Sequence, residues 1–192
     1  MAFQVTICGI SELDLHCEVG VTHVLSILDP EWPEPAVFLA FPPHRRLELR
    51  FHDVIDPMPR ALLPEAEHVA RLLEFGRHVI AAGPAAHVLV HCHAGISRST
   101  AATALLLAQA DPDRTPDDTF AEIARLRSRA WPNLRLLELG DRALGRDGAL
   151  VKAVAAQYRR VIDADPNFAR FMRDSGRGRE VTLAQAALSD RN

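Results

Sequence analysis

One short segment carries residue types at a spacing that could bind and attack an oxyanion. Residues 88–103 are Val-Leu-Val-His-Cys-His-Ala-Gly-Ile-Ser-Arg-Ser-Thr-Ala-Ala-Thr: an apolar strand, a short loop with a glycine, and then a helical pattern. Such a loop around a helix N-terminus turns backbone N–H groups inward and adds the positive end of the helix dipole, so it can cradle a tetrahedral anion. Cys92 begins the loop and Arg98 ends it. The spacing therefore predicts a thiol beneath the anion and a guanidinium that grips two of its oxygens.

The neighbours of Cys92 also favour a reactive thiol. Gly95 permits the tight curve of the loop. The helix dipole, Arg98 and the hydroxyl of Ser99 all stabilise a thiolate over a thiol, and a thiolate is the nucleophilic form of cysteine. The same loop is thus predicted to bind the anion and to attack it.

The elements needed to position this loop are present in the pattern on either side of it. Runs of β-branched and apolar residues predict strands at 3–10, 22–28, 46–51 and 87–90, the last buried on both faces. Helical periodicity predicts helices at 11–19, 64–83, 98–109, 115–129, 134–144 and 149–164. Five prolines between 29 and 43 predict an irregular connection there. Strands that alternate with helices and lead into a helical run predict an α/β fold, a three-layer sandwich with a mostly parallel central sheet flanked by helices.

Composition limits the function classes. The chain has 192 residues, of which 48% are hydrophobic and 24% charged, and this length and composition predict one domain over 1–174. Residues 175–192 are predicted to form a tail, in which 183–188 could add a turn of helix. A net charge of −3 gives no broad attraction to nucleic acid. No basic leader or long apolar run predicts a membrane anchor. The arginines at 125, 127 and 129 and at 170, 173, 177 and 179 are interpreted as solvated faces.

The cysteines favour a reducing compartment. Cys8, Cys17 and Cys92 make an odd number without a CxxC pair, which argues against a disulfide framework or a structural zinc site and favours the cytoplasm. Cys8 and Cys17 are interpreted as core residues, with a redox partnership as the alternative. The sequence leaves the oligomeric state open.

The loop closely resembles the signature HCxxGxxR[S/T] of the cysteine-dependent protein tyrosine phosphatases, and the resemblance, which extends over most of the chain, is closest to their dual-specificity branch. The matching residues are His91, Cys92, His93, Ala94, Gly95, Ile96, Ser97, Arg98 and Ser99. The resemblance implies a single phosphatase-like domain without metal or cofactor, in which residues 93–98 bind the phosphate. It also implies that the Cys92 thiolate displaces the alcohol of a phosphomonoester, that Ser99 stabilises the thiolate as it leaves again, and that His91 helps to hold the loop.

The resemblance further implies a general acid some thirty to forty positions before the cysteine. Asp53 and Asp56 both qualify. Asp53 follows the strand 46–51 directly, where dual-specificity relatives place their acid, and it is favoured. Asp56 lies deeper in the loop between strand and helix, where Pro57 and Pro59 could orient it, and it stays the alternative.

The substrate is predicted only as a class. Positions 93, 94, 96 and 97 are His, Ala, Ile and Ser, whereas relatives that act on inositol phosphates carry lysines there, so a phosphorylated protein is favoured over a phosphoinositide or another small phosphomonoester. Two other classes remain: a silent phosphate-binding module, and a sulfurtransferase that carries a persulfide on Cys92. The Arg-Ser ending of the loop suits phosphate better than persulfide chemistry.

Overall fold

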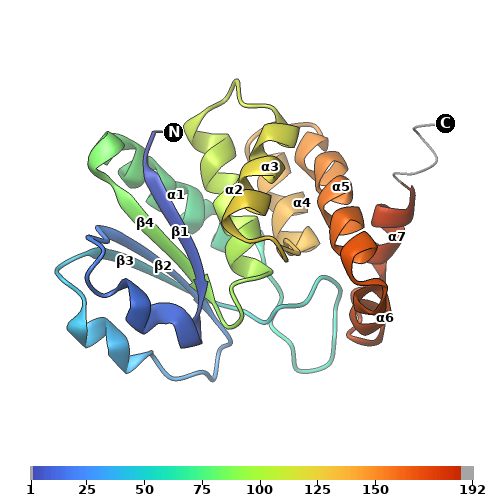
Figure 1. Ribbon diagram of the computed structural model, residues 1–192, viewed down its shortest axis with the longest axis horizontal. Coiled ribbons are helices and arrows are strands. Elements are labelled where there is room, and N and C mark those ends of the chain that lie inside the picture. The colour runs from blue at the N-terminus through green and yellow to red at the C-terminus, as the bar shows by residue number, and fades with distance from the viewer. Residues whose placement is uncertain (1, 187–192) are drawn as a thin grey trace.

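The computed structural model describes residues 2–186, and these form an α/β structure around one parallel sheet (Figure 1). The strands are β1 (Gln4–Gly9), β2 (His23–Leu28), β3 (Arg45–Arg50) and β4 (His87–Cys92), and their order in the sheet is β1-β4-β2-β3. All three strand pairs are parallel. The carboxyl ends of all four strands therefore meet at one edge of the sheet, where the loops of an α/β protein gather.

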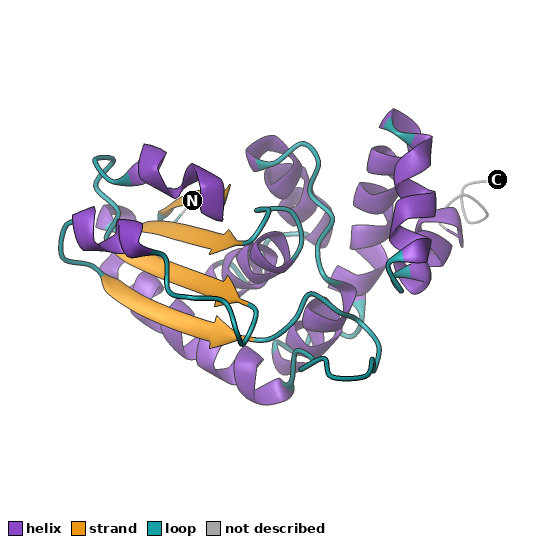
Figure 2. Ribbon diagram, turned by 90° about the horizontal axis from the view of Figure 1, so that it is seen from below, coloured by secondary structure: helices purple, strands orange, loops and turns teal. Residues whose placement is uncertain are grey.

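Both faces of the sheet are covered by helices, as Figure 2 shows. Alternate strand residues face opposite ways, so Val88 and Val90 join the larger core while Leu89 joins the smaller one. The larger core lies under the α-helices α1 (Ala66–Ala82), α2 (Arg98–Ala110), α3 (Pro116–Leu126), α4 (Leu134–Ala143) and α5 (Ala149–Ala164). The smaller core lies under the 3₁₀ helices η1 (Ile10–His16) and η2 (Ala36–Ala40), and a third 3₁₀ turn, η3 (Gly83–Ala85), leads into β4. The predicted three-layer α/β fold is confirmed.

The helix predicted at 11–19 is the 3₁₀ helix η1, and the one predicted at 115–129 ends at Leu126. Three further segments differ more from the prediction. The connection 29–43 contains η2, which occupies the proline-free stretch between Pro35 and Pro42. The helix α6 (Pro166–Asp174) was not predicted, although Asp165 caps it and Pro166 begins it. The helix α7 (Gly178–Ala186) is longer than the predicted turn, whose residues 187 and 188 lie outside the described part of the chain.

The helices α6 and α7 lie at the right of Figure 1, and the first turn of α7 contacts the loop that connects β3 to α1 through the ion pair of Arg179 with Asp56. Val181 and Ala184 of α7 are buried in the larger core. The segment after 174 thus packs on the body of the protein and approaches the carboxyl edge of the sheet. Within residues 2–186, none of the helices has the length and apolar character that crossing a bilayer requires.

Candidate active site

The loop between β4 and α2 turns its carbonyl oxygens away from its centre. The backbone N–H groups of Ile10 and Trp131 donate to the carbonyls of His93 and Ile96, each at 2.9 Å. The N–H groups of the loop after His93 donate to no acceptor in the described part of the chain. The next residues begin α2, whose first N–H groups also lack helical partners, so the loop and the start of this helix together offer a set of unpaired donors to an anion.

Two glycines allow the loop to lie directly against β1. A Cβ on Gly95 would stand 2.5 Å from the carbonyl carbon of Cys8 and 2.6 Å from the nitrogen of Gly9. Gly95 also has φ +69°, in the left-handed region. A Cβ on Gly9 would stand 2.9 Å from the carbonyl oxygen of His93. Backbone meets backbone here, so neither position can accept a side chain without moving the loop.

We expect Gly95→Ala to disrupt the loop. The backbone strain alone costs about 1–3 kcal/mol, and the clash with β1 adds to it, so both the free energy of unfolding and anion binding should fall. Urea unfolding and calorimetric titration with phosphate measure the two losses. Gly20→Ala is the matched control, since Gly20 has a similar φ of +73° but a Cβ placed on it would have no atom within 4 Å. Equal effects of the two substitutions would contradict a role for the close contact.

An ion pair holds the loop from outside. Arg127 donates from Nε to the carbonyl of Gly95 and from Nη2 to that of Ala94, both at 3.2 Å, and from Nη1 to Glu12 at 2.9 Å. Glu12 also accepts the backbone N–H of Gly9 at 2.6 Å, and its hydrogen bond with Arg127 lowers its pKa. The expectation of a solvated face is therefore wrong for Arg127. No local pattern reveals this pair, because its members are 115 positions apart.

Cys92 and Ser99 face each other across the base of the loop. The Sγ of Cys92 lies 3.2 Å from the Oγ of Ser99, and both residues are buried. The structure thus brings together the thiol and the hydroxyl that the sequence pairs as nucleophile and thiolate-stabilising group.

Arg98 is fixed by one end of its guanidinium. Its Nη1 donates to Oδ1 of Asp29 at 2.6 Å and to the carbonyl of Phe51 at 2.7 Å. Its Nε is buried and has no partner within residues 2–186. Because both hydrogen bonds are made by Nη1, the Nε side of the guanidinium is available to bind an oxyanion. Asp29, which directly follows β2, is a site residue that the sequence analysis missed.

The two histidines of the loop have different partners. His91 is fully buried, with Nε2 2.7 Å from the Oγ of Ser26, and burial lowers its pKa to about 3, so the ring is neutral. His93 accepts the backbone N–H of Asp29 on Nε2 at 3.2 Å, and burial, followed by Arg98, lowers its pKa. The ring of His93 lies 4.5 Å from that of Trp32 between centroids. Trp32 is 45% exposed and gives the site an aromatic wall.

Asp53 lies directly on the loop. Its Oδ1 accepts from the Oγ of Ser97 at 2.7 Å and from Nδ2 of Asn133 at 2.9 Å, and it lies 3.1 Å from Nη1 of Arg177. Burial acts to raise the pKa of Asp53, but Arg177 and then Arg98 outweigh burial, so the pKa lies below its usual range. The loops after β3 and β4 therefore meet where the strands end, and this brings the carboxylate of Asp53 into contact with the loop that follows β4.

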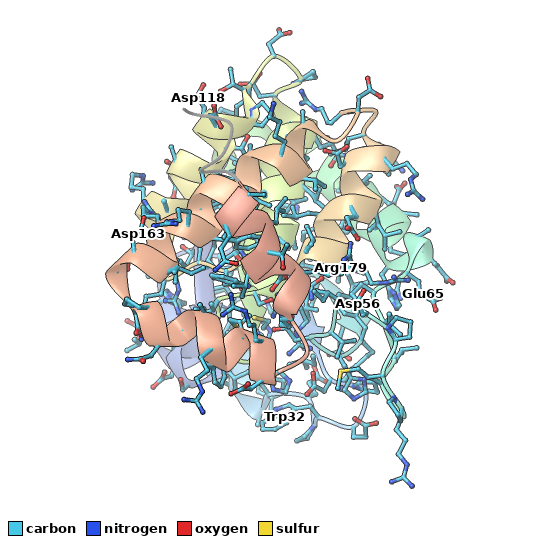
Figure 3. The ribbon with its side chains drawn as sticks, turned by 90° about the vertical axis from the view of Figure 1, so that its right-hand side faces the viewer. Trp32, Asp56, Glu65, Asp118, Asp163 and Arg179 are labelled. Carbon is cyan, nitrogen blue, oxygen red and sulfur yellow. The ribbon has the colours of Figure 1, made fainter. Side chains whose placement is uncertain are left out.

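Asp56 points to a different partner. It forms an ion pair with Arg179 at 2.9 Å, and Figure 3 shows the two side chains near each other, away from Trp32. Arg179 also contacts Glu138. Of the two aspartates, the structure places Asp53 on the loop and Asp56 in an exposed cluster with α4 and α7.

Arg177 is buried, which corrects the expectation of a solvated face at this position. It is 5% exposed, donates from Nη1 to the Oγ of Ser97 at 2.8 Å, and pairs through Nε and Nη2 with Glu180 at 2.8 and 2.6 Å. The spacing of three positions between Arg177 and Glu180 suggests a local pair, but the sequence alone does not indicate that this pair faces the loop. Within residues 2–186, no three His, Cys, Asp or Glu side chains gather as a metal site would require.

Comparison with known proteins shows a likeness of fold. A scan against protein-family models found no match, and a search of curated proteins found none either. The four parallel strands and their flanking helices are arranged as in solved structures of protein tyrosine and dual-specificity phosphatases, so the likeness is one of fold. The predicted resemblance is confirmed at the level of the fold.

Three solved structures show the extent of the likeness. The chain is 17% identical to human DUSP28, with a TM-score of 0.54 over 76% of this chain and 94% of that one. It is 19% identical to the PTP-2 phosphatase of Cydia pomonella, with a TM-score of 0.54 over 71% of this chain and 83% of that one. It is 18% identical to PTPMT1, solved in complex with PI(5)P, with a TM-score of 0.52 over 77% of this chain and 94% of that one.

Proposed function

We propose that the protein is a phosphatase that hydrolyses phosphomonoesters through a phosphocysteine intermediate, with Cys92 as nucleophile and Asp53 as general acid. One observation carries the proposal: the thiol of Cys92, next to Ser99, lies at the base of a loop whose N–H groups and whose Arg98 Nε have no other acceptor among the described residues. Such an arrangement suits a tetrahedral dianion held above a nucleophile.

In the first step the Cys92 thiolate attacks phosphorus, so a sulfur–phosphorus bond forms while the bond from phosphorus to the ester oxygen breaks. The loop N–H groups and Arg98 bind the three equatorial oxygens, and they stabilise the charge that collects there. The leaving oxygen takes a proton from the carboxyl group of Asp53. The products are the alcohol, the phosphocysteine and the Asp53 carboxylate.

In the second step water attacks the phosphocysteine. The Asp53 carboxylate takes a proton from this water, phosphate leaves, and the sulfur–phosphorus bond breaks. The hydroxyl of Ser99, 3.2 Å from Sγ, stabilises the thiolate that departs. Both steps balance without a metal or a redox cofactor.

The surroundings of the loop favour a substrate with a single phosphate on an aromatic ring. The arginines that belong to the loop or contact it directly are each already paired with a carboxylate: Arg98 with Asp29, Arg127 with Glu12, and Arg177 with Glu180 and Asp53. None of these three cations is therefore free for a second phosphate. The wall of Trp32 and His93 offers a flat surface for an aryl ring. We therefore propose phosphotyrosine in proteins as the first substrate, with phosphoserine and phosphothreonine next.

The main alternative is a small-molecule phosphomonoester such as a phosphoinositide. One structural neighbour, PTPMT1, was solved in complex with PI(5)P, so this fold accommodates such a ligand. The paired arginines and the loop without lysines favour the protein substrate. The odd number of cysteines, all free in the structure, suits a reducing compartment, and we propose a cytoplasmic location.

A substrate panel tests the proposal. We expect phosphate release to be fastest from phosphotyrosine peptides, slower from phosphoserine and phosphothreonine peptides, and slowest from phosphoinositide vesicles. Vanadate, which adopts the geometry of the transition state, should inhibit, and chelators should not. A preference for vesicles would support the alternative. Sulfur transfer from thiosulfate without phosphate release would contradict the phosphatase.

The aromatic wall gives a second, more selective test. Trp32→Ala should raise KM for a phosphotyrosine peptide about two- to tenfold, since an aromatic pair contributes about 0.5–1.5 kcal/mol, and it should leave KM for a phosphoserine peptide nearly unchanged. Leu39→Ala, which removes a 93% exposed apolar side chain from η2, is the control. Equal changes in KM for both peptides would contradict the contact with the substrate ring.

A further inference from the structure

The segment after α6 supplies a side chain to the candidate general acid. Arg177 lies between α6 and α7, and its Nη1 is 3.1 Å from Oδ1 of Asp53 and 2.8 Å from the Oγ of Ser97. The hydroxyl of Ser97 in turn donates to Asp53 at 2.7 Å. Asp53 is thus joined to Arg177 both directly and through a residue of the loop.

Glu180 fixes the direction of this guanidinium. The carboxylate of Glu180 is fully buried and accepts two hydrogen bonds from Arg177, one from the indole N–H of Trp131, and one from the backbone N–H of Leu134 at 3.0 Å. A carboxylate bound by four donors has no freedom to turn. Because Nε and Nη2 of Arg177 are held on Glu180, its Nη1 is directed at Asp53 and Ser97.

We propose that Arg177, held by Glu180, is a positioning residue that fixes the orientation and the protonation of the general acid, and thereby sets the pH range in which the phosphatase works. The proposal rests on the phosphatase function and goes beyond it, because it gives the C-terminal segment a part in catalysis. The carboxyl that must donate a proton is oriented by a permanent cation, which opposes its protonation.

The groups that face Asp53 come from several elements. Arg177 precedes α7, Arg98 begins α2, and Asn133 caps α4 with its side chain. His93 in the loop and Tyr158 of α5 also interact with its charge. Arg98 is needed for phosphate binding, and the pKa of the buried Tyr158 is raised well above its usual value, so this phenol stays neutral. Arg177 is therefore the cation whose removal changes the charge at Asp53 without removing a ligand of the substrate.

Nuclear magnetic resonance and kinetics test the proposal together. Carboxyl carbon resonances give the pKa of Asp53 directly, and kcat/KM across pH gives the falling limb that its ionisation causes. The amide in Arg177→Gln can still form a hydrogen bond with Glu180. In this variant we expect the pKa of Asp53 and the pH at which kcat/KM falls to rise by about 1–3 pH units, because an opposite charge at this distance lowers a carboxyl pKa by that much. The rate at the acidic plateau should fall, because the carboxyl loses one of the groups that orient it.

Three further variants separate this effect from folding. Arg177→Lys retains the cation, so kcat/KM should fall at nearly the same pH as in the unmodified protein. The double variant Arg177→Met with Glu180→Gln removes the buried pair without leaving a lone buried carboxylate, and it should repeat the shift seen in Arg177→Gln if that variant folds poorly. Arg170→Gln removes an 88% exposed arginine side chain from α6 and should change neither value.

The outcomes distinguish the two proposals. An unchanged pKa of Asp53 in Arg177→Gln and in the double variant would overturn the role of Arg177, as would lower stability without a shift of the limb. If the unmodified protein releases no phosphate from any substrate, the phosphatase function fails instead. The resonance titration would then still decide whether Arg177 controls the carboxyl.

Discussion

Cys92→Ser should abolish phosphate release while leaving phosphate binding intact. The hydroxyl is a far weaker nucleophile than a thiolate, and a hydrolase that loses its nucleophile loses turnover on the order of a million-fold. The donors of the loop and the Nε edge of Arg98 stay in place because Cys92 contributes only Sγ to the site. The dissociation constant of a phosphotyrosine peptide, measured by calorimetry, should therefore be unchanged or lower, since one negative charge beneath the phosphate has gone.

A second cysteine provides the control for this prediction. Cys17 is also free; it packs against the smaller core, and its Sγ donates to the carbonyl of Leu13 at 3.9 Å. Cys17→Ser should keep full turnover. Persistent phosphate release in Cys92→Ser would contradict the covalent mechanism, and loss of peptide binding in that variant would contradict the assignment of binding to the loop backbone and Arg98.

Asp53→Asn should have the second largest effect. Asparagine keeps the shape of the side chain and an acceptor oxygen for Ser97 and Asn133, but it has no proton to give. A positioned acid contributes about 100- to 10,000-fold, so hydrolysis of a phosphotyrosine peptide should slow by that range. An activated aryl phosphate, whose leaving group needs little protonation, should slow much less.

The pH dependence of the unmodified protein follows from the same residue. A general acid acts only while protonated, and its protonated fraction falls as pH rises through its pKa. Because Arg177 and Arg98 outweigh burial and lower the pKa of Asp53, kcat/KM should fall at a lower pH than an ordinary aspartate would give, and the optimum should be acidic. In Asp53→Asn this fall should be absent. Asp56→Asn should keep both rate and profile, and the reverse result would move the acid to Asp56.

Much of the fold can be predicted from local patterns. Runs of β-branched and apolar residues predict the strands because both faces of the sheet are packed. Apolar periodicity predicts α1, α3, α4 and α5 because each of these helices buries one side, whereas residues 98–108 of α2 are buried on every side. The helix α6 was missed although Asp165 and Pro166 are a recognisable start, since its short apolar stripe lies in an arginine-rich segment. The helix η2 is too short to show a period.

The residues of the candidate site also fall into those that a local pattern predicts and those that it does not. The placement of Cys92, Arg98 and Ser99 follows from nine consecutive residues, so a local pattern is sufficient. The pairs that orient the site, such as Arg127 with Glu12 and Arg177 with Asp53, join residues more than a hundred positions apart. An arginine that braces a buried loop has the same local sequence signal as one in water, and only the packing of helices distinguishes them.

The strand order β1-β4-β2-β3 separates two chemical tasks in space. In the proposed mechanism, attack and anion binding belong to the loop after β4, which has neighbouring strands on both sides, whereas proton donation belongs to the loop that leaves β3 at the edge of the sheet. Insertions and exchanges are tolerated best in connections at such an edge, while a central strand tolerates them least. Descendants of this chain could therefore acquire new leaving groups and a new working acidity by remodelling residues 54–64, with the nucleophile inherited unaltered.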